Sequence, residues 1–202
     1  MGMIQAGIPF CPSLHILPAM SFDSRQVYQP EADTFLLQSA ARDEIRPGDR
    51  VLEIGTGSGT IAAGLTGASL VVATDINPHA ALCAHAAGIE VIRTDLAAGL
   101  RGRFDLVLFN PPYLPTQPEE RIDDWLEYAL DGGVSGRVVI GRFAGEVGRL
   151  VAPGGRILLL ISHLTGVSTV KDLFSLQGFC CETVAEQDAE GEMLYVLKFV
   201  RK

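Results

Sequence analysis

The sequence predicts an α/β fold whose β-sheet is mostly parallel and ends in an antiparallel hairpin. Short β-rich runs alternate with helix-like segments through most of the 202 residues, an order typical of a parallel sheet with helices on both faces. Near the C-terminus, two β-rich runs follow one another with only residues 188–192 between them. Such a short connection forms a hairpin, and the two strands of a hairpin are antiparallel.

The individual elements follow from apolar spacing and from the residues that stop them. A helix is expected over residues 30–45, because apolar residues recur at helical spacing between an early Pro30 and the closing residues 46–49, RPGD. Strands are expected where β-branched and apolar residues form short runs, at 50–54, 70–74, 90–94, 104–110, 156–162, 180–187 and 193–200. Helices are expected between several of these strands, at 60–67, 78–88, 136–155 and 167–178.

Composition indicates a globular protein rather than a membrane or disordered chain. Hydrophobic residues make up 48% and charged residues 20% of the sequence, the balance of a soluble domain. The longest apolar run, residues 157–161, is far too short to cross a bilayer. The first twenty residues contain three prolines and no basic start, which fits a secretory signal poorly. We therefore expect a cytoplasmic protein with an N-terminal extension over residues 1–26.

Net charge and cysteine spacing argue against a nucleic-acid-binding protein and against a protein stabilised by metal or disulfides. A formal net charge of −8 disfavours a protein that grips a long nucleic acid by itself, because that affinity comes mainly from Lys and Arg on phosphates. The cysteines form no CxxC pair and have no histidine at ligand spacing; they are Cys11, Cys83, Cys180 and Cys181. We therefore expect neither a metal site nor a disulfide framework.

A glycine-rich turn follows the first expected strand. Glu53 precedes Gly55, Gly57 and Gly59 in EIGTGSGT, and glycines here let the chain turn tightly and let a ligand approach the backbone. The spacing is not GxGxxG, and no GKS or GKT follows, so a phosphate-binding loop is disfavoured. By itself, such a turn does not decide between a cofactor site and ordinary packing.

Two acidic residues end the next two strands. Asp75 ends the second strand and can accept both hydroxyls of a ribose; its alternative role is a helix cap. Asp95 ends the third strand and can accept from an exocyclic amino group, with Ile76 and Leu96 against a flat base. The alternative for Asp95 is a solvated strand end. Taken in order with the glycines, the two acids favour a nucleotide-like cofactor.

In type and order, Glu53, the glycines, Asp75 and Asp95 resemble the S-adenosylmethionine-dependent methyltransferases, whose seven-stranded Rossmann-like sheet ends in an antiparallel hairpin. The resemblance covers residues 27–202 and implies one methyltransferase domain with this class I fold. It implies that Glu53 lies near the methionine end of the cofactor and that the glycines pass under it. It also implies that Asp75 holds the ribose and that Asp95 reads the adenine.

The fourth expected strand breaks off into Asn110, Pro111, Pro112 and Tyr113, and prolines cannot continue a paired strand. A planar NH₂ group is a poor nucleophile and must be held so that its nitrogen faces a methyl donor. The Asn110 side-chain oxygen and the Pro111 carbonyl can accept its two N–H groups, and the prolines fix their direction. Tyr113 can lie on the flat substrate, and Asn110 is also expected beside the cofactor. The alternative is an ordinary turn after a strand.

The NPPY-type tetrapeptide is shared by enzymes that methylate adenine, guanine or glutamine amino groups, and three other segments favour glutamine. Residues 27–37, 128–143 and 191–202 resemble the HemK-type glutamine methyltransferases, in particular their short archaeal and eukaryotic branch. The resemblance implies methylation of the glutamine in the Gly-Gly-Gln loop of a class 1 translation release factor. The alternatives are an adenine amino-methyltransferase acting on DNA or RNA and a catalytically silent cofactor-binding subunit.

The same resemblance implies a cover for the cofactor and a partner protein. The covering segment would contain Tyr28, Pro30, Asp33 and Thr34, with Thr34 at the carboxylate end of the cofactor. Alternatively, Asp33 and Thr34 only begin a helix. The acid that usually precedes Asp33 is Ala32 here, with Glu31 one place earlier. The short branch works with a small zinc-binding activator protein, which is expected to add a strand at the edge of the third strand.

Overall fold

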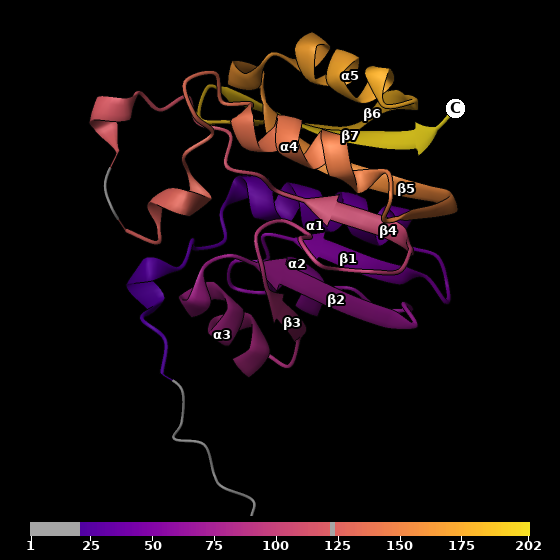
Figure 1. Cartoon of the computed structure of the whole chain (residues 1–202), viewed down its shortest axis with the longest axis horizontal. Coiled ribbons are helices and arrows are strands. Elements are labelled where there is room, and N and C mark those ends of the chain that lie inside the picture. The colour runs from indigo at the N-terminus through magenta and orange to yellow at the C-terminus, as the bar shows by residue number, and fades with distance from the viewer. Residues whose placement is uncertain (1–20, 122–123) are drawn as a thin grey trace, which may run out of the picture.

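A seven-stranded sheet forms the middle of the computed structural model, which describes residues 21–121 and 124–202 (Figure 1). The strands lie in the order β3-β2-β1-β4-β5-β7-β6. Neighbours from β3 to β5 pair in parallel, and β7 pairs antiparallel with both β5 and β6. The predicted fold class is therefore confirmed. The strand bounds are Arg50–Ile54 (β1), Leu70–Asp75 (β2), Glu90–Arg93 (β3), Phe104–Phe109 (β4), Val151–Ser162 (β5), Phe179–Ala189 (β6) and Glu192–Arg201 (β7).

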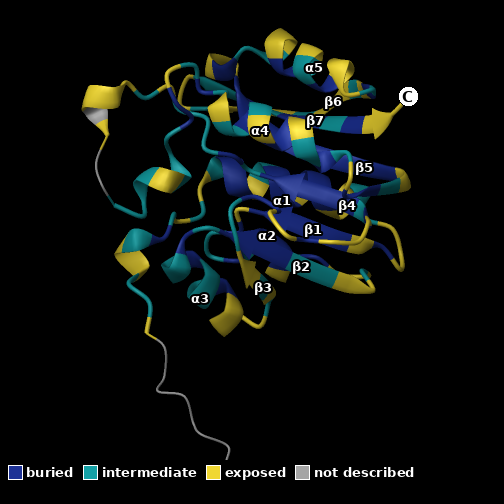
Figure 2. Cartoon of the chain, in the orientation of Figure 1, coloured by how far each residue is buried: buried dark blue, intermediate teal, exposed yellow. Residues whose placement is uncertain are grey.

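Helices cover both faces of this sheet. α1 (Ala32–Glu44) and α2 (Thr60–Ala63) pack on one face, and α4 (Val138–Val147) and α5 (Val167–Leu176) pack on the other. α3 (Pro78–Ala86) packs against β2 and β3. Figure 2 shows the central strands buried between these layers, with the exposed residues on the outer surfaces of the helices. Short 3₁₀ turns lie in the connections, at Ser24–Gln26, Pro118–Glu120, Glu127–Ala129 and His163–Thr165.

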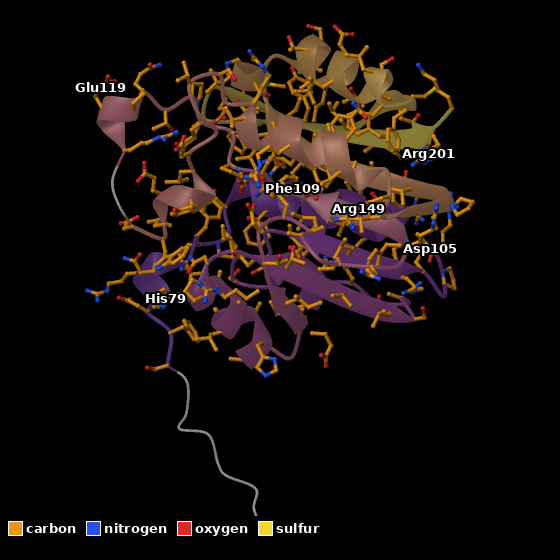
Figure 3. The ribbon with its side chains drawn as sticks, in the orientation of Figure 1. His79, Asp105, Phe109, Glu119, Arg149 and Arg201 are labelled. Atoms are coloured by element: carbon orange, nitrogen blue, oxygen red, sulfur yellow. The ribbon has the colours of Figure 1, made fainter. Side chains whose placement is uncertain are left out.

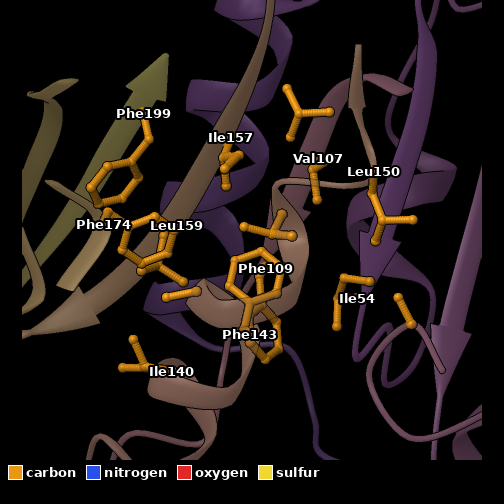
Figure 4. Packing of buried hydrophobic residues seen from close by; sticks show 14 of the residues in the cluster. Ile54, Val107, Phe109, Ile140, Phe143, Leu150, Ile157, Leu159, Phe174 and Phe199 are labelled. Atoms are coloured by element: carbon orange, nitrogen blue, oxygen red, sulfur yellow. The ribbon is translucent and has the colours of Figure 1, made fainter. Parts of the chain in front are cut away.

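Aromatic side chains hold the α4 and α5 face of the sheet. The rings of Phe174 and Phe199 stack with centroids 3.9 Å apart, and those of Phe109 and Phe143 meet edge to face at 4.8 Å (Figure 4). All four side chains are buried, and burying each ring contributes about 1.5–3 kcal/mol to folding. Because Phe109 is the last residue of β4, this packing also fixes where the chain leaves the sheet at Asn110.

A buried arginine ties the opposite end of the sheet together. Arg156 is 1% exposed and donates to Asp49 Oδ2 at 2.6 Å, to the Asp105 carbonyl at 3.0 Å and to the Glu44 carbonyl. Burial alone raises the pKa of Asp49, but the hydrogen bonds from Arg156 and the backbone outweigh it, and the pKa lies below its usual value. Asp105 lies at the far end of β4 from Phe109 (Figure 3). This charge network therefore stands away from the carboxyl ends of the parallel strands.

The helix predicted over residues 136–155 is wrong at its C-terminal end. α4 stops at Val147, and β5 begins at Val151, before the predicted start of that strand. A Cβ atom on Gly155 would lie 3.0 Å from the Phe104 carbonyl oxygen, so glycine is what lets β5 approach β4 this closely. Pairing with β4 extends the strand, and a local sequence pattern does not report that pairing.

The C-terminal hairpin turns more tightly than predicted. Only Glu190 and Gly191 separate β6 from β7, whereas the expected connection covered residues 188–192. Both residues have positive φ, 55° and 92°, as in the type I′ turns whose twist matches that of paired antiparallel strands. The Gly191 N–H also donates to Asp188 Oδ1 at 2.8 Å. The antiparallel hairpin itself is confirmed.

The N-terminal segment packs beside α3 where it is described. Residues 1–20, which include Cys11 and most of the predicted extension, lie outside the described residues. Further along, Asn77 Nδ2 donates to the Gln26 carbonyl at 2.7 Å. The segment before α1 is thus attached to the loop after β2.

Neither a membrane span nor a metal cluster is found in the described part of the chain. No helix within residues 21–121 and 124–202 is long and apolar enough to cross a membrane. In the same ranges, no group of three or more His, Cys, Asp or Glu side chains could hold a metal ion. The described cysteines, Cys83, Cys180 and Cys181, are free thiols.

Candidate active site

A cavity of about 940 Å³ opens where the carboxyl ends of β1, β2 and β4 meet. Segments far apart in the sequence line it: the residues before α1, the turn after β1, the ends of β2 and β4, and the loop before α4. Gly59 does not line the cavity. The predicted site residues that do line it are Tyr28, Thr34, Glu53, Gly55, Gly57, Asp75, Ile76, Asp95, Leu96, Asn110, Pro111, Pro112 and Tyr113.

The glycine-rich turn forms the wall after β1. Gly55 and Gly57 have φ angles of 65° and 56°, a left-handed region that residues with side chains rarely adopt. A Cβ atom on Gly57 would meet only the Tyr28 carbonyl oxygen, at 3.9 Å, so the backbone here faces open space. Gly59 has a different purpose, because a Cβ atom on it would lie 3.0 Å from the Cβ of Ala84 in α3. It allows helix packing rather than ligand approach.

Asp75 ends β2 with its carboxylate against the glycine turn. Oδ2 accepts from the Gly57 N–H at 2.9 Å, and Oδ1 accepts from the Asn77 N–H at 2.8 Å. Burial raises the pKa of Asp75, and these backbone N–H groups oppose the rise. The cap of α3 is Asn77, whose side chain accepts from the His79 N–H, so the alternative role of Asp75 as a helix cap is wrong. Because a carboxylate has about four acceptor sites, Asp75 keeps capacity for further donors.

Asp95 and Leu96 form the wall beyond β3. Arg142 of α4 pairs with Asp95 Oδ2 at 2.6 Å, and both side chains remain about half exposed. Sequence reasoning missed Arg142, because the two residues are 47 positions apart and only the packing of α4 brings them together. Leu96 is buried with a φ of 49°, which is uncommon for a non-glycine residue. Such strained backbone gathers at ligand sites.

Glu53 is a buried carboxyl on the cavity wall. Its Oε2 accepts from Thr56 Oγ1 at 2.9 Å and from the Ala62 N–H at 3.1 Å, and the residue is 2% exposed. Burial raises the pKa of Glu53 to about 8, against the lowering effect of those two hydrogen bonds. A cation bound beside Glu53 would offset the cost of its burial, because an opposite charge favours the ionised form.

Asn110 is held at the end of β4 through its amide nitrogen. Its Nδ2 donates to Asp33 Oδ2 at 3.0 Å, and the same carboxylate oxygen accepts from the Tyr28 hydroxyl at 3.1 Å. The Asn110 Oδ1 atom is buried and accepts from none of the described residues. Burial raises the pKa of Tyr28 and of Tyr113, and the Asp33 carboxylate raises both further, so both phenols stay neutral. Sequence reasoning placed Asp33 in the covering segment but missed this contact, which joins residues 77 positions apart.

Residues 132–136, which have the sequence GGVSG, lie against the turn that contains Pro111 and Pro112. The Leu114 N–H donates to the Leu130 carbonyl at 3.2 Å, and the Gly132 N–H donates to the Leu114 carbonyl at 2.9 Å. Gly136 has a φ of 67°, and a Cβ atom on it would lie 2.5 Å from the Tyr113 carbonyl oxygen. Close backbone packing against Tyr113 therefore requires glycine at this position.

An aromatic cover joins the N-terminal segment to β3. The Trp125 N–H donates to Gln26 Oε1 at 2.9 Å, and the Arg93 guanidinium lies over the Trp125 ring, 5.8 Å from its centroid. The Tyr128 ring lies 5.2 Å from that of Trp125, and both rings line the cavity. Sequence reasoning missed Trp125, since its contacts lie in segments remote from it in the chain.

These groups fit S-adenosylmethionine, which carries two positive groups, a ribose diol and a flat base. The acids Glu53 and Asp75 stand beside a glycine turn that faces open space, in a cavity with a strained Leu96 on its wall. Fold and site together define a class I methyltransferase that uses S-adenosylmethionine. Over 180 residues the chain is 38% identical to a protein named N5-glutamine methyltransferase from Methanocaldococcus jannaschii, and the match covers 85% of this chain and 90% of that protein. The chain belongs to the family of HEMK2-type protein N5-glutamine methyltransferases.

Further comparisons also match methyltransferases. Human methyltransferase HEMK2 is 35% identical, with 87% of this chain and 90% of that protein covered. A family model for ribosomal protein L11 methyltransferase (PrmA) matches residues 34–91. Among solved structures, the E. cuniculi Mtq2–Trm112 complex, described as responsible for methylation of the translation termination factor eRF1, contains a similar chain. That chain has a TM-score of 0.75 and 29% identity, with 88% of this chain and 99% of that chain covered.

Replacing Gly136 with alanine is expected to lower kcat for methyl transfer strongly while the protein remains folded. The new Cβ must displace the Tyr113 carbonyl, and misplacing a reacting group by about 1 Å costs about 10²-fold in rate. The measurement is kcat together with thermal unfolding. Gly141→Ala is the matched control, because a Cβ atom there meets nothing within 4 Å. Equal rates for the two variants would contradict the supporting role of Gly136.

Cofactor affinity is expected to rise with pH up to about 8 and to level off above it. Without the cofactor, Glu53 is mostly protonated below its pKa of about 8, whereas the bound cation favours the ionised form. Binding therefore releases a proton, and affinity rises at most about tenfold per pH unit in that range. Calorimetry in buffers of different ionisation enthalpy measures both effects. Glu53→Gln should abolish the slope; a slope that survives in this variant assigns the proton to another group.

Proposed function

We propose that the protein transfers a methyl group from S-adenosylmethionine to the side-chain amide nitrogen of the glutamine in the Gly-Gly-Gln loop of a class 1 translation release factor. The observation that carries the proposal is the buried Asn110 Oδ1 atom, which lacks a donor among the described residues. An acceptor in this position binds a hydrogen-bond donor, such as an N–H group of a side-chain amide. Family membership and the eRF1 methylation named for the Mtq2–Trm112 complex support the choice of substrate.

The chemistry of the proposed reaction is mainly that of positioning. Bound S-adenosylmethionine supplies a methyl group on a positively charged sulfur. Asn110 Oδ1 and the Pro111 carbonyl accept the two N–H groups of the substrate amide, which turns its nitrogen towards that methyl group and draws electron density onto it. As the new C–N bond forms and the C–S bond breaks, the nitrogen gives up one proton to solvent. Neutral Tyr113 packs on the flat amide. No strong general base is required, because positioning and the pull of the two acceptors on the amide protons supply the help.

Acidic side chains in the cavity favour a protein substrate over nucleic acid. Glu31, Glu127 and Glu192 contribute to its lining, and carboxylates repel a phosphate backbone. The three arginines among the described lining residues are each paired with an acid: Arg25 with Asp23, Arg121 with Asp131, and Arg142 with Asp95. This observation weighs against the adenine amino-methyltransferase. A catalytically silent subunit has no use for the Asn110 oxygen, because a buried acceptor without a partner costs stability.

We also propose that residues 27–202 are the methyltransferase domain and that the protein works in the cytoplasm, where release factors act. The sheet, its helices and nearly all of the cavity lining fall within this range; Ser24 and Arg25 add to the lining from the segment before it.

Purified protein with tritiated cofactor is expected to label a release factor on one glutamine. Asn110→Ala should lower kcat by about 10²–10³-fold, because it removes an acceptor aimed at the reacting group, while cofactor affinity measured by calorimetry falls much less than kcat. A release factor whose loop glutamine is replaced by asparagine is the substrate control. Duplex DNA and RNA form parallel arms. Labelling of nucleic acid alone would sink the proposed substrate.

We further propose a heterodimer in which a small zinc-binding activator protein adds a strand to β3. Within the described residues β3 has β2 as its one strand neighbour, so its other edge offers unpaired backbone groups. Ile92 on this strand is 46% exposed. Arg93, the last residue of β3, contacts Trp125 over the cavity, which would place a partner strand beside the cofactor site. The Trm112 subunit in the complex of the Mtq2 relative supports such an arrangement.

Ile92→Lys is expected to weaken capture of the partner and to leave the free protein folded. The substitution puts a charge on the proposed interface. Binding of the partner would bury this unpaired charge, which lowers the affinity. The measurement is co-purification of tagged protein with an activator protein of the Trm112 type, followed by thermal unfolding. Leu176→Lys is the control, since Leu176 is 83% exposed on α5, a helix that contacts β6 at the opposite edge of the sheet from β3. Equal capture of the activator by both variants would show that the partner does not bind at β3.

A further inference from the structure

We infer that Asp33 is a positioning residue, which holds the Asn110 amide with its oxygen rather than its nitrogen towards the methyl acceptor. The inference rests on the proposed function, in which that oxygen accepts an N–H of the substrate amide. The contact that carries it is the hydrogen bond from Asn110 Nδ2 to Asp33 Oδ2, at 3.0 Å. The inference adds a residue outside the Asn110–Tyr113 tetrapeptide, because Asp33 lies on a different element, α1.

An asparagine side chain needs such a device because its two ends are nearly equal in shape. One end is an acceptor and the other carries two donors. If the amide of Asn110 turned over, an NH₂ group would face the NH₂ group of the substrate, and two donors do not bind each other. Neither proline of the corner prevents this rotation, since prolines restrain only the backbone. A partner that accepts and never donates is required behind the amide.

Asp33 meets this requirement. An ionised carboxylate only accepts hydrogen bonds, so the group that faces Asp33 must be the Asn110 nitrogen. The carboxylate is itself held by other donors: Oδ2 accepts from the Tyr28 hydroxyl, and Oδ1 accepts from the Thr34 N–H and Oγ1. Asp33 is 4% exposed, so water does not replace these donors freely. Rotation of the Asn110 amide is therefore opposed by a fixed acceptor.

The scaffold keeps the two residues in register. Asp33 stands in the first turn of α1, where a negative charge is favoured by the helix dipole. Leu37 of α1 is fully buried in the same apolar cluster as Leu106 and Leu108 of β4. Asn110 follows β4 directly, so a single packed core positions both the carboxylate and the amide. The start of α1, which sequence reasoning placed in the segment covering the cofactor, thus also contacts Asn110.

A double-mutant cycle tests the inference. With wild-type protein and a release factor, Asp33→Asn should lower kcat by about 10²-fold, because asparagine can donate to Asn110 Oδ1 and turn it away from the substrate. In the Asn110→Ala background the same change should lower kcat little further, since the group that it orients is gone. Cofactor affinity by calorimetry and thermal unfolding are measured for each variant. Asp43→Asn, an exposed change on the same helix, is the matched control.

Full additivity of the two changes in kcat would overturn the inference and leave Asp33 with a role in folding or cofactor binding alone. The exchanged pair Asp33→Asn/Asn110→Asp supplies the second measurement. In that variant the amide at position 33 can donate to one oxygen of the carboxylate at position 110, while the other oxygen of that carboxylate faces the substrate. Its kcat should therefore exceed that of Asp33→Asn, and an exchanged pair that is no faster would contradict the inference as well. A wild-type protein that does not label the release factor at all would instead refute the proposed function.

Discussion

Parallel pairing of β1 with β2 and β4 is the constraint on which the site depends. In a parallel sheet the carboxyl ends of all strands lie on the same side of the sheet. Glu53, Asp75 and Asn110 therefore meet there despite their separation in the sequence. The hairpin of β6 and β7 lies beyond β5 in the strand order, away from β1, β2 and β4. A cavity lined by strand ends thus follows from the topology, and the side chains at those ends decide what it binds.

The two ends of the sheet treat buried charge in opposite ways. At one end Arg156 forms ion pairs with Asp49 and Glu44 and also donates to the Asp105 carbonyl, so the opposite charges balance one another inside the protein. At the cavity end Glu53 has a pKa raised by burial, and Asn110 Oδ1 has no partner among the described residues. Uncompensated groups of this kind reduce stability. Their concentration in the cavity is the physical mark of a site whose partners are the cofactor and the substrate.

Contacts with neighbouring segments fix the conformation of residues 110–113, which follow β4. Phe109 is anchored by Phe143, and the backbone beyond it is held by Leu114 and by the close approach of Gly136 to Tyr113. The prolines restrict the backbone between these anchors. In the proposed reaction, acceptors that aim at a small NH₂ group need this precision, because catalysis by positioning falls steeply with misplacement.

The sequence by itself determined the fold class, the order of most elements and many of the residues that line the cavity. Those inferences rest on periodicity, turn residues and motifs, which are local or follow a fixed topology. It misplaced the start of β5, because strand pairing with β4 decides that boundary. It also left Arg142 beside Asp95, Trp125 beside Gln26 and Asp33 behind Asn110 undiscovered. Each of these contacts joins segments far apart in the chain, and only the tertiary packing of α1, α4 and the covering loop onto one sheet could decide which side chains meet.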